Sequence, residues 1–157
     1  MASLVESTLR LLSNEWKDKV DIKVDVEPEL SFEANANQIT QVLINLVQNA
    51  IDATDRKSYE ADEKPTIRIA ARGRADRAVI SIRDNGPGIS EEFVNRVFDP
   101  CFTTRDVGEG VGLGLSICYK IIERHGGHID VKTEYGKFCE FALVFPKLAL
   151  VEAVLPE

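Results

Sequence analysis

The 157-residue sequence predicts an α/β sandwich of the α+β class, in which a mixed five-stranded sheet is covered on one face by about three helices. Three observations favour this class. Three runs alternate apolar and polar residues, as half-buried strands do, and two further runs near the C-terminus are also expected to be strands. Stretches with helical periodicity are interleaved with these runs, and a short "GRAD" segment joins two of them as a hairpin. Because a hairpin pairing is antiparallel, a one-sided α+β layer fits better than a doubly wound parallel sheet.

The elements follow in order along the chain. Strict alternation predicts strands, and apolar residues spaced i, i+3 and i+4 predict helices. The expected strands are residues 21–27, 66–72, 78–84, 128–134 and 138–145. The expected helices are residues 4–16, 35–54 and 113–125, with one or two helical turns at 90–98. Asn35 or Asn37 can cap the long helix, and Gly126 with Gly127 ends the last one.

Composition excludes several classes of protein. A net charge of -7 lacks the basic field that non-specific nucleic-acid binding needs. The chain has no apolar run of membrane-spanning length and no basic-then-apolar N-terminal pattern. We therefore expect a domain without direct membrane contact, either cytoplasmic or the cytoplasmic part of a membrane-anchored protein. Three cysteines, an odd number without a CxxC pair, favour free thiols. Residues 1–146 are expected to form one domain, followed by a C-terminal tail at 147–157.

The first segment that suits a ligand is "NLVQNAIDA" in the long helix. On a helical wheel Asn45, Asn49 and Asp52 fall within about 60° of one another, beside the apolar arc. Asparagine is a mediocre helix former and is costly to bury without partners. Taken alone, this stripe is as consistent with a solvated helix flank as with a binding site.

The second segment is "RDNGPGI". Asp84 follows directly on an expected strand, and the Asn-Gly-Pro-Gly sequence forces a turn. A carboxylate at a strand end is a good acceptor for an exocyclic amino group such as that of adenine. Gly86 and Gly88 leave room for a flat ligand to approach the main chain. In isolation, an ordinary Asp-Asn-Gly turn is the better explanation of this segment.

The third segment is "GEGVGLGLS". Gly110, Gly112 and Gly114 alternate just where a helix begins, and backbone N–H groups at a helix N-terminus suit phosphates. The segment is not a Walker loop, because the chain contains no G-x-x-x-x-G-K-[ST] sequence. It is not a dinucleotide fingerprint either, because Leu115 stands where that pattern needs a glycine.

Together, the order and spacing of these segments resemble the ATP-binding domain shared by sensor histidine kinases, gyrase-type topoisomerases, Hsp90 chaperones and MutL repair proteins. "NLVQNAIDA" looks like the N box, "DNGPGI" the first glycine box, "FDPCFTT" the F box and "GVGLGLSI" the second glycine box. The resemblance covers roughly residues 4–146 and implies a Bergerat-type fold with a mostly antiparallel sheet. The "QNAIDA" and "FTT" forms look closest to the nitrogen-regulation-type histidine kinases.

The resemblance implies ATP and Mg²⁺ as cofactors. Asn49 would coordinate the Mg²⁺ that bridges the phosphates, since an amide oxygen suits this hard cation. Asp84 would accept the adenine amino hydrogen, and Arg105, where the family often has lysine, would clamp a phosphate. The lid between Asp99 and Val111 would close over the triphosphate. The other implied nucleotide contacts are Asn45, Asp52, Gly86, Gly88, Ile89, Thr103, Thr104, Gly110, Val111, Gly112, Leu113, Gly114 and Leu115.

Asn45 and Arg105 are the expected catalytic positions. Hydrolytic relatives, and serine kinases of the family, carry glutamate four residues before the magnesium asparagine. A carboxylate can take a proton from water or a serine hydroxyl, but an amide cannot. A neutral imidazole needs no such base, so Asn45 favours phosphoryl transfer to histidine over a stand-alone serine kinase or ATPase. A non-catalytic ATP-binding switch module stays an alternative.

The resemblance also implies partners outside the chain. His125 and His128 lie at a helix end and a strand start, where we expect structural roles. The acceptor histidine of the family lies on a dimerisation domain of the same parent protein, with a response regulator downstream. Two positions depart from the pattern. Cys139 replaces a threonine that commonly helps hold adenine, and Cys101, expected to be a small packed residue, replaces a phenylalanine of the F box.

Overall fold

A computed structural model describes residues 1–103 and 112–147 of the chain. Its five strands form a mixed sheet in the order β1-β2-β3-β5-β4. β1 pairs with β2 in parallel, whereas the β2–β3, β3–β5 and β4–β5 pairs are antiparallel. The strands are β1 (Asp21–Val26), β2 (Thr66–Gly73), β3 (Arg77–Asp84), β4 (His128–Glu134) and β5 (Phe138–Pro146). The predicted fold class is therefore confirmed.

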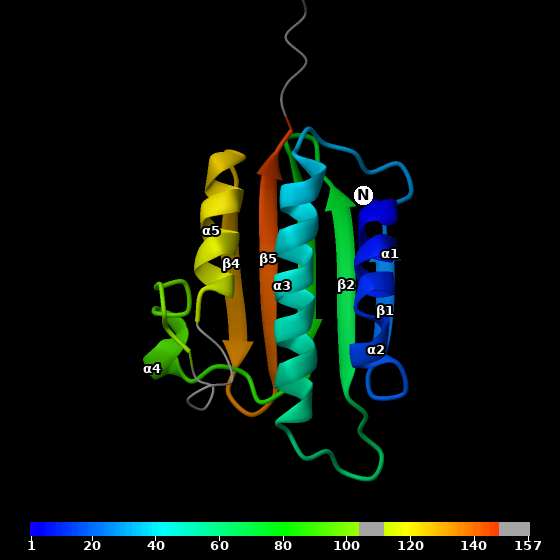
Figure 1. The fold of residues 1–157 in the computed structure, drawn as a ribbon, viewed down its shortest axis with the longest axis vertical. Helices are drawn as coiled ribbons and strands as arrows, with labels where there is room; N and C mark the ends of the chain where they lie inside the picture. The colour runs from blue at the N-terminus through cyan, green and yellow to red at the C-terminus, as the bar shows by residue number, and fades with distance from the viewer. Residues whose placement is uncertain (104–111, 148–157) are drawn as a thin grey trace, which may run out of the picture.

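Helices cover one face of this sheet (Figure 1). The long helix α3 lies over the middle strands, with α1 on the β1 side and α5 on the β4 side. The helices are α1 (Ala2–Leu11), α2 (Ser13–Trp16), α3 (Ala36–Asp55), α4 (Glu91–Val94) and α5 (Gly114–Arg124). The core fills the space between the helices and the inward-facing residues of β2, β3 and β5. Among the described residues, no helix is long and apolar enough to cross a membrane.

The cap of α3 follows local sequence. The side chain of Asn35 accepts a hydrogen bond of 3.1 Å from the backbone N–H of Gln38, so Asn35 rather than Asn37 is the N-cap. The cap fixes where α3 begins. The apolar face of α3 packs on the sheet, and its polar residues therefore lie along the margin of the core.

The structure differs from the predicted elements at two places near the N-terminus. The single helix expected at 4–16 is divided into α1 and α2, and the indole N–H of Trp16 donates to the carbonyl of Leu9 at 2.9 Å, satisfying an end of α1 with a side chain. The alternation in residues 21–27 predicts that Val24 shares the apolar face of a half-buried strand with Ile22 and Val26. Val24 pairs with Ile69 but is 49% exposed, because β1 is an edge strand with a neighbour on one side only.

His125 joins the end of α5 to the start of α3. Its Nε2 accepts a hydrogen bond of 3.1 Å from the backbone N–H of Asn35, and its Nδ1 lies 2.7 Å from the carbonyl oxygen of Ile121. Since a carbonyl oxygen only accepts, the proton of the neutral ring is assigned to Nδ1. The structural role expected for His125 fits these contacts.

We expect His125→Ala to lower the free energy of unfolding by about 1–2 kcal/mol, because one hydrogen bond between α5 and the start of α3 and one within the end of α5 are lost. Urea denaturation followed by circular dichroism measures the change. His128→Ala is the matched control, since the side chain of His128 contacts Asp130 at 3.3 Å where both side chains are exposed. It should change the free energy of unfolding by less than about 0.5 kcal/mol. Equal effects of the two variants would contradict a bridging role for His125.

Candidate functional site

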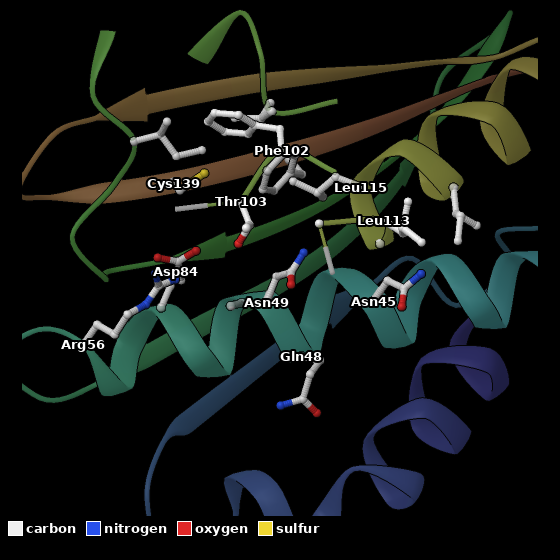
Figure 2. A pocket seen from close by; sticks show the side chains of 18 of the residues that line it. Asn45, Gln48, Asn49, Arg56, Asp84, Phe102, Thr103, Leu113, Leu115 and Cys139 are labelled. Atoms are coloured by element: carbon white, nitrogen blue, oxygen red, sulfur yellow. The ribbon is translucent and has the colours of Figure 1, made fainter. Parts of the chain in front are cut away.

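A cleft of about 520 Å³ opens beside α3, bounded by the end of β3, residues 97–103 and the start of α5 (Figure 2). Most of the predicted contacts line it. They are Asn45, Asn49, Asp84, Gly88, Ile89, Thr103, Gly112, Leu113, Gly114 and Leu115. Four further predicted contacts, Thr104, Arg105, Gly110 and Val111, lie outside the described residues.

Asn45 and Asn49 project from α3 toward the cleft, one turn apart (Figure 2). Asn45 lies next to the start of α5, since a Cβ placed on Gly114 would stand 3.8 Å from its Cγ. It also contacts the Cys118 thiol on α5. Burial raises the pKa of Cys118 to about 11, and the Asn45 amide offsets part of that rise. Asn45 thus connects the two helices, while Asn49 lies nearer the middle of the cleft wall.

Asp84 places a carboxylate at the floor of the cleft. It is the last residue of β3, it is only 5% exposed, and its Oδ1 accepts a hydrogen bond of 2.9 Å from the backbone N–H of Gly86. Burial raises the pKa of Asp84 to about 6, and the hydrogen bond from Gly86 and the charge of Arg56 oppose the rise. At pH 7 the group is therefore mostly ionised and is a strong acceptor.

Two predicted contacts do not line the cleft. The carboxylate of Asp52 accepts a hydrogen bond of 3.0 Å from the side chain of Gln48, one turn earlier on α3. Gly86 lies in a crowded place: a Cβ there would stand 2.8 Å from Oδ1 of Asp84 and 3.0 Å from the carbonyl oxygen of Ala53. The absence of a side chain at Gly86 lets the turn pack on α3, a role that the sequence pattern did not reveal.

Gly88 and Gly112 are required by their backbone conformations. Gly88 has a φ of +67°, and a Cβ there would stand 2.4 Å from the carbonyl oxygen of Glu134 in the β4–β5 hairpin. Gly112 has a φ of +70°, and a Cβ there would stand 2.5 Å from the carbonyl oxygen of Phe102. Both glycines bring the cleft lining close to neighbouring backbone.

We expect Gly88→Ala to lower the free energy of unfolding by on the order of 3 kcal/mol, because it adds overlap to an unfavourable backbone conformation. Chemical denaturation without nucleotide measures this. Gly136→Ala is the matched control: its φ is +85°, but within the described part of the chain no atom beyond its two chain neighbours lies within 4 Å of the added Cβ. It should lower the value by only about 1 kcal/mol. Equal losses of stability in the two variants would show that the β4–β5 hairpin does not constrain the turn that contains Gly88.

Residues 97–103 cover the side of the cleft opposite α3. Phe102 lines the cleft and packs against Phe93 of α4 with ring centroids 5.6 Å apart. The guanidinium carbon of Arg96 lies 5.0 Å from the centroid of the Phe102 ring. Cys101 is exposed, with a φ of +64°, so the expectation that it packs as a small apolar residue is wrong. The expected lid extends from this segment into residues that the structure does not describe.

Sequence reasoning missed Arg56. This cation lines the cleft beside Asp84, and its Nε donates to the backbone carbonyl of Asp52 at 3.2 Å (Figure 2). Arg56 follows Asn49 by seven residues, and seven residues are close to two helical turns. The same wheel that aligned Asn45 with Asn49 therefore contained the signal, but Arg56 falls just past the end of α3, where no helical position was expected.

Cys139 forms the wall above Asp84. The two residues are paired across β5 and β3, and Cys139 is buried and lines the cleft. Burial, together with the charge of Asp84, raises the pKa of Cys139 to about 12, so its thiol stays neutral. The residue that stands where the resemblance implies a threonine thus lines the cleft with a weak hydrogen-bonding group.

The start of α5 supplies the other end of the cleft. α5 begins at Gly114, and the amide of Ile117 donates to the carbonyl of Leu113 at 3.0 Å. The backbone N–H groups in the first turn of α5 have no acceptor within the helix, as is general for helix N-termini. The positive end of the helix dipole therefore lies at the cleft, where an anionic group is favoured.

Comparisons with known proteins identify the family and agree with the fold. Residues 34–149 match the family model described as Histidine kinase-, DNA gyrase B-, and HSP90-like ATPase. The catalytic domain of histidine kinase ThkA superposes with a TM-score of 0.78 at 36% identity, covering 93% of each chain. ThkA in complex with response regulator protein TrrA superposes with a TM-score of 0.75 at 34% identity, covering 94% of this chain and 40% of that one.

Two of the curated relatives are named as sensor kinases. Sensor histidine kinase ZraS of Salmonella typhimurium is 34% identical over 93% of this chain and 30% of its own length. Sensor kinase CckA of Brucella abortus is 33% identical over 94% of this chain and 16% of its own length. The chain belongs to the histidine kinase-, gyrase B- and Hsp90-like ATPase family, as an ATPase domain of the sensor histidine kinase type. It spans less than a third of the length of these curated relatives.

Proposed function

We propose that this domain binds Mg-ATP and donates the γ-phosphoryl group to a histidine on a dimerisation domain of its parent protein, as a step in two-component signalling. The observation that carries the proposal is one cleft with an acceptor carboxylate at one end and a helix N-terminus at the other. Asp84 suits a purine amino group, and the start of α5 suits phosphates. ATP has these two chemistries at its two ends.

The base end of the cleft suits adenine. The ionised carboxylate of Asp84 accepts the exocyclic amino hydrogen of adenine, whereas the oxygen that guanine carries at the same position would face it unfavourably. Cys139 and Phe141 of β5 form an apolar wall for a flat base, and Gly88 with Ile89 forms the adjoining main chain. Arg56 borders this end as a cation.

The phosphate end suits a magnesium-bound triphosphate. The Asn49 amide oxygen is the kind of ligand that Mg²⁺ takes together with phosphate oxygens and waters. When bound, the ion would neutralise charge that develops on the transferred phosphoryl group. The amides of Gly114 and Leu115 at the start of α5 would donate to phosphate oxygens. Thr104 and Arg105 are proposed as further phosphate contacts.

The nature of residue 45 favours histidine as the acceptor. Asn45 faces the cleft with an amide, which cannot act as a general base toward water or serine. Histidine needs none, and catalysis would come mainly from positioning and charge neutralisation. We therefore favour a histidine kinase over a stand-alone serine kinase or ATPase. The "QNAIDA" form supports the nitrogen-regulation subgroup. A non-catalytic switch module that uses the same cleft is the second candidate.

The partners and setting follow from this proposal. ThkA, solved with a response regulator, is the precedent for proposing a response regulator downstream of this domain. We propose that residues 1–146 are the ATP-binding domain, with 147–157 as a tail, and that it works on the cytoplasmic side of the cell. Residues 148–157 lie outside the described part of the chain.

Incubating the full-length parent protein with γ-labelled ATP and Mg²⁺ tests the proposal. We expect acid-labile, alkali-stable phosphohistidine, which transfers to a response regulator when one is added. ATP binding without phosphohistidine would support the switch module. Phosphoserine, or phosphate release without a phosphoenzyme, would overturn the assignment made from Asn45.

A further inference from the structure

Asn85 follows the base-recognising carboxylate but does not line the cleft. Its backbone N–H donates to the carbonyl of Thr66 at 3.2 Å, and its Oδ1 accepts from the backbone N–H of Thr66 at 2.8 Å. Its Nδ2 donates to the carbonyl of Lys64 at 2.7 Å. The last strand pair before it joins Ile67 to Asp84. Asn85 thus adds a further rung to the β2–β3 ladder, made partly by its side chain.

Two residues of the α3–β2 loop hold Asn85 from the other direction. Tyr59 donates its hydroxyl to both the backbone oxygen and Oδ1 of Asn85, at 3.3 Å each. Lys57 donates to the backbone oxygen of Asn85 at 3.1 Å, forms a 3.2 Å ion pair with Glu63, and lies 5.1 Å from the centroid of the Tyr59 ring. Every polar group of Asn85 is therefore engaged outside the cleft.

The state of Tyr59 suits this role. Burial raises its pKa to about 12, and the charges of Asp84, Glu63 and Asp55 add to the rise. The phenol consequently keeps its proton throughout the physiological pH range and always donates to Asn85. The contact lies next to Asp84, because the Asn85 that accepts from Tyr59 directly follows Asp84 in the chain.

A carboxylate that selects a base must be held within a few tenths of an ångström, because a looser acceptor also tolerates other ring substituents. On the cleft side, Asp84 is held by the amide of Gly86. That amide belongs to the same turn and moves with it. Asp84 pairs with Ile67 and Cys139 in the sheet, and the turn after it is tied to the β4–β5 hairpin, where the backbone N–H of Gly136 donates to the carbonyl of Pro87 at 2.6 Å. The anchor on the residue next to Asp84 lies behind the strand, where Asn85 is joined to the α3–β2 loop.

We infer that Asn85, Tyr59 and Lys57 form a polar brace that positions the Asp84 carboxylate and thereby sets the selectivity of the cleft for adenine over guanine. The inference rests on the proposed ATP-binding function. Asn85 is a positioning residue in this arrangement, because it contacts the loop and not the nucleotide. The brace also connects base selection to the loop between α3 and β2.

Calorimetric titration of Asn85→Ala and Tyr59→Phe with ATP, ADP and GTP tests the brace. We expect each variant to bind ATP about 10-fold more weakly, which corresponds to about 1.4 kcal/mol. GTP affinity should change little, and the ratio of ATP to ADP affinity should stay as in the wild type because the phosphate end is untouched. The effects should be less than additive in the double variant, since both act through one network.

Matched controls separate positioning from general destabilisation. His125→Ala weakens the fold away from the cleft and should leave the ATP-to-GTP ratio unchanged. Tyr135→Phe removes the hydroxyl of a tyrosine that is 72% exposed and should change nothing. If Asn85→Ala weakens ATP, ADP and GTP equally, or only to the extent that His125→Ala does, the brace is overturned.

A second measurement does not depend on nucleotide. NMR titration of the Asp84 carboxyl group in Asn85→Ala should show its pKa moving toward the ordinary aspartate value, because a loosened turn admits water to the carboxylate. An unchanged titration overturns the brace. Failure of the wild type to bind any nucleotide overturns the proposed function instead, and this titration still decides whether Asn85 positions Asp84.

Discussion

Asn49→Ala is expected to weaken Mg-ATP binding by about 100-fold or more, which is about 2.7 kcal/mol. The side chain lies on the cleft wall of α3, and its oxygen is the protein ligand that we propose for Mg²⁺. The fold should be retained, because Asn49 is not part of the buried core and alanine is the better helix former. Isothermal titration calorimetry with Mg²⁺ and ATP measures the loss.

Chelation sharpens this experiment. If Asn49 acts through the metal, the difference between wild type and Asn49→Ala should largely disappear when ATP is titrated in the presence of EDTA. Asn37→Ala, an exposed asparagine in the first turn of the same helix, is the control and should bind as the wild type does. An undiminished affinity of Asn49→Ala for Mg-ATP would refute the assignment, and an equal loss with EDTA would refute the role of the metal.

Asp84→Asn is expected to have opposite effects on binding and on stability. The amide cannot accept from the adenine amino group with the strength of a carboxylate, so the preference for ATP over GTP should fall by about 10-fold or more. The wild-type preference should likewise weaken as the pH falls through about 6, where the carboxyl group of Asp84 becomes protonated. Competition between the two nucleotides, measured from pH 5 to 8, tests both statements.

The stability effect follows from the sign of the pKa shift. The pKa of Asp84 is raised from 3.8 to about 6, so between these values the folded state binds more protons than the unfolded state. The stabilising contribution of Asp84 to the free energy of unfolding is present in full below pH 3.8 and is lost as the pH rises through about 6. The difference is on the order of 3 kcal/mol. Without nucleotide, Asp84→Asn should therefore be more stable than the wild type at pH 7.

Thermal unfolding across this pH range provides the measurement. Asp62→Asn, which neutralises an exposed carboxylate, should leave the pH dependence of the wild type intact. A wild-type stability that is flat between pH 4 and 7, or one that Asp84→Asn leaves unaltered, would show that the buried carboxylate is not the cause. A gain in stability with a loss of selectivity would identify Asp84 as a residue kept for binding at a cost to the fold.

Much of the site was predictable because its signals are local. Asn45 and Asn49 are aligned by helical periodicity alone, and Asp84 is placed at a strand end by the alternation before it and the turn after it. Arg56 was missed although it continues the same helical stripe. Asp52, which shares that stripe, turns instead to Gln48, and a wheel cannot distinguish these outcomes.

The long-range parts of the site had no such signal. The crowding of Gly86 against Ala53, the close approach of Gly88 to Glu134, and the contacts of Asn85 with Tyr59 each join segments that are distant along the chain. Sequence spacing reports on neighbours within a helix or strand. It carries no measure of which loop returns to which strand end.

The sequence by itself determined the class of fold, the order of its elements and the principal polar residues of the cleft, because periodicity and turn chemistry act over a few residues. Only the tertiary structure decided which of those polar groups face the cleft and how far their pKa values are shifted. The pKa of Asp84 near 6 is the clearest case. Burial by β5, α3 and the glycine turn raises that pKa, and burial arises only when segments far apart in the chain pack together.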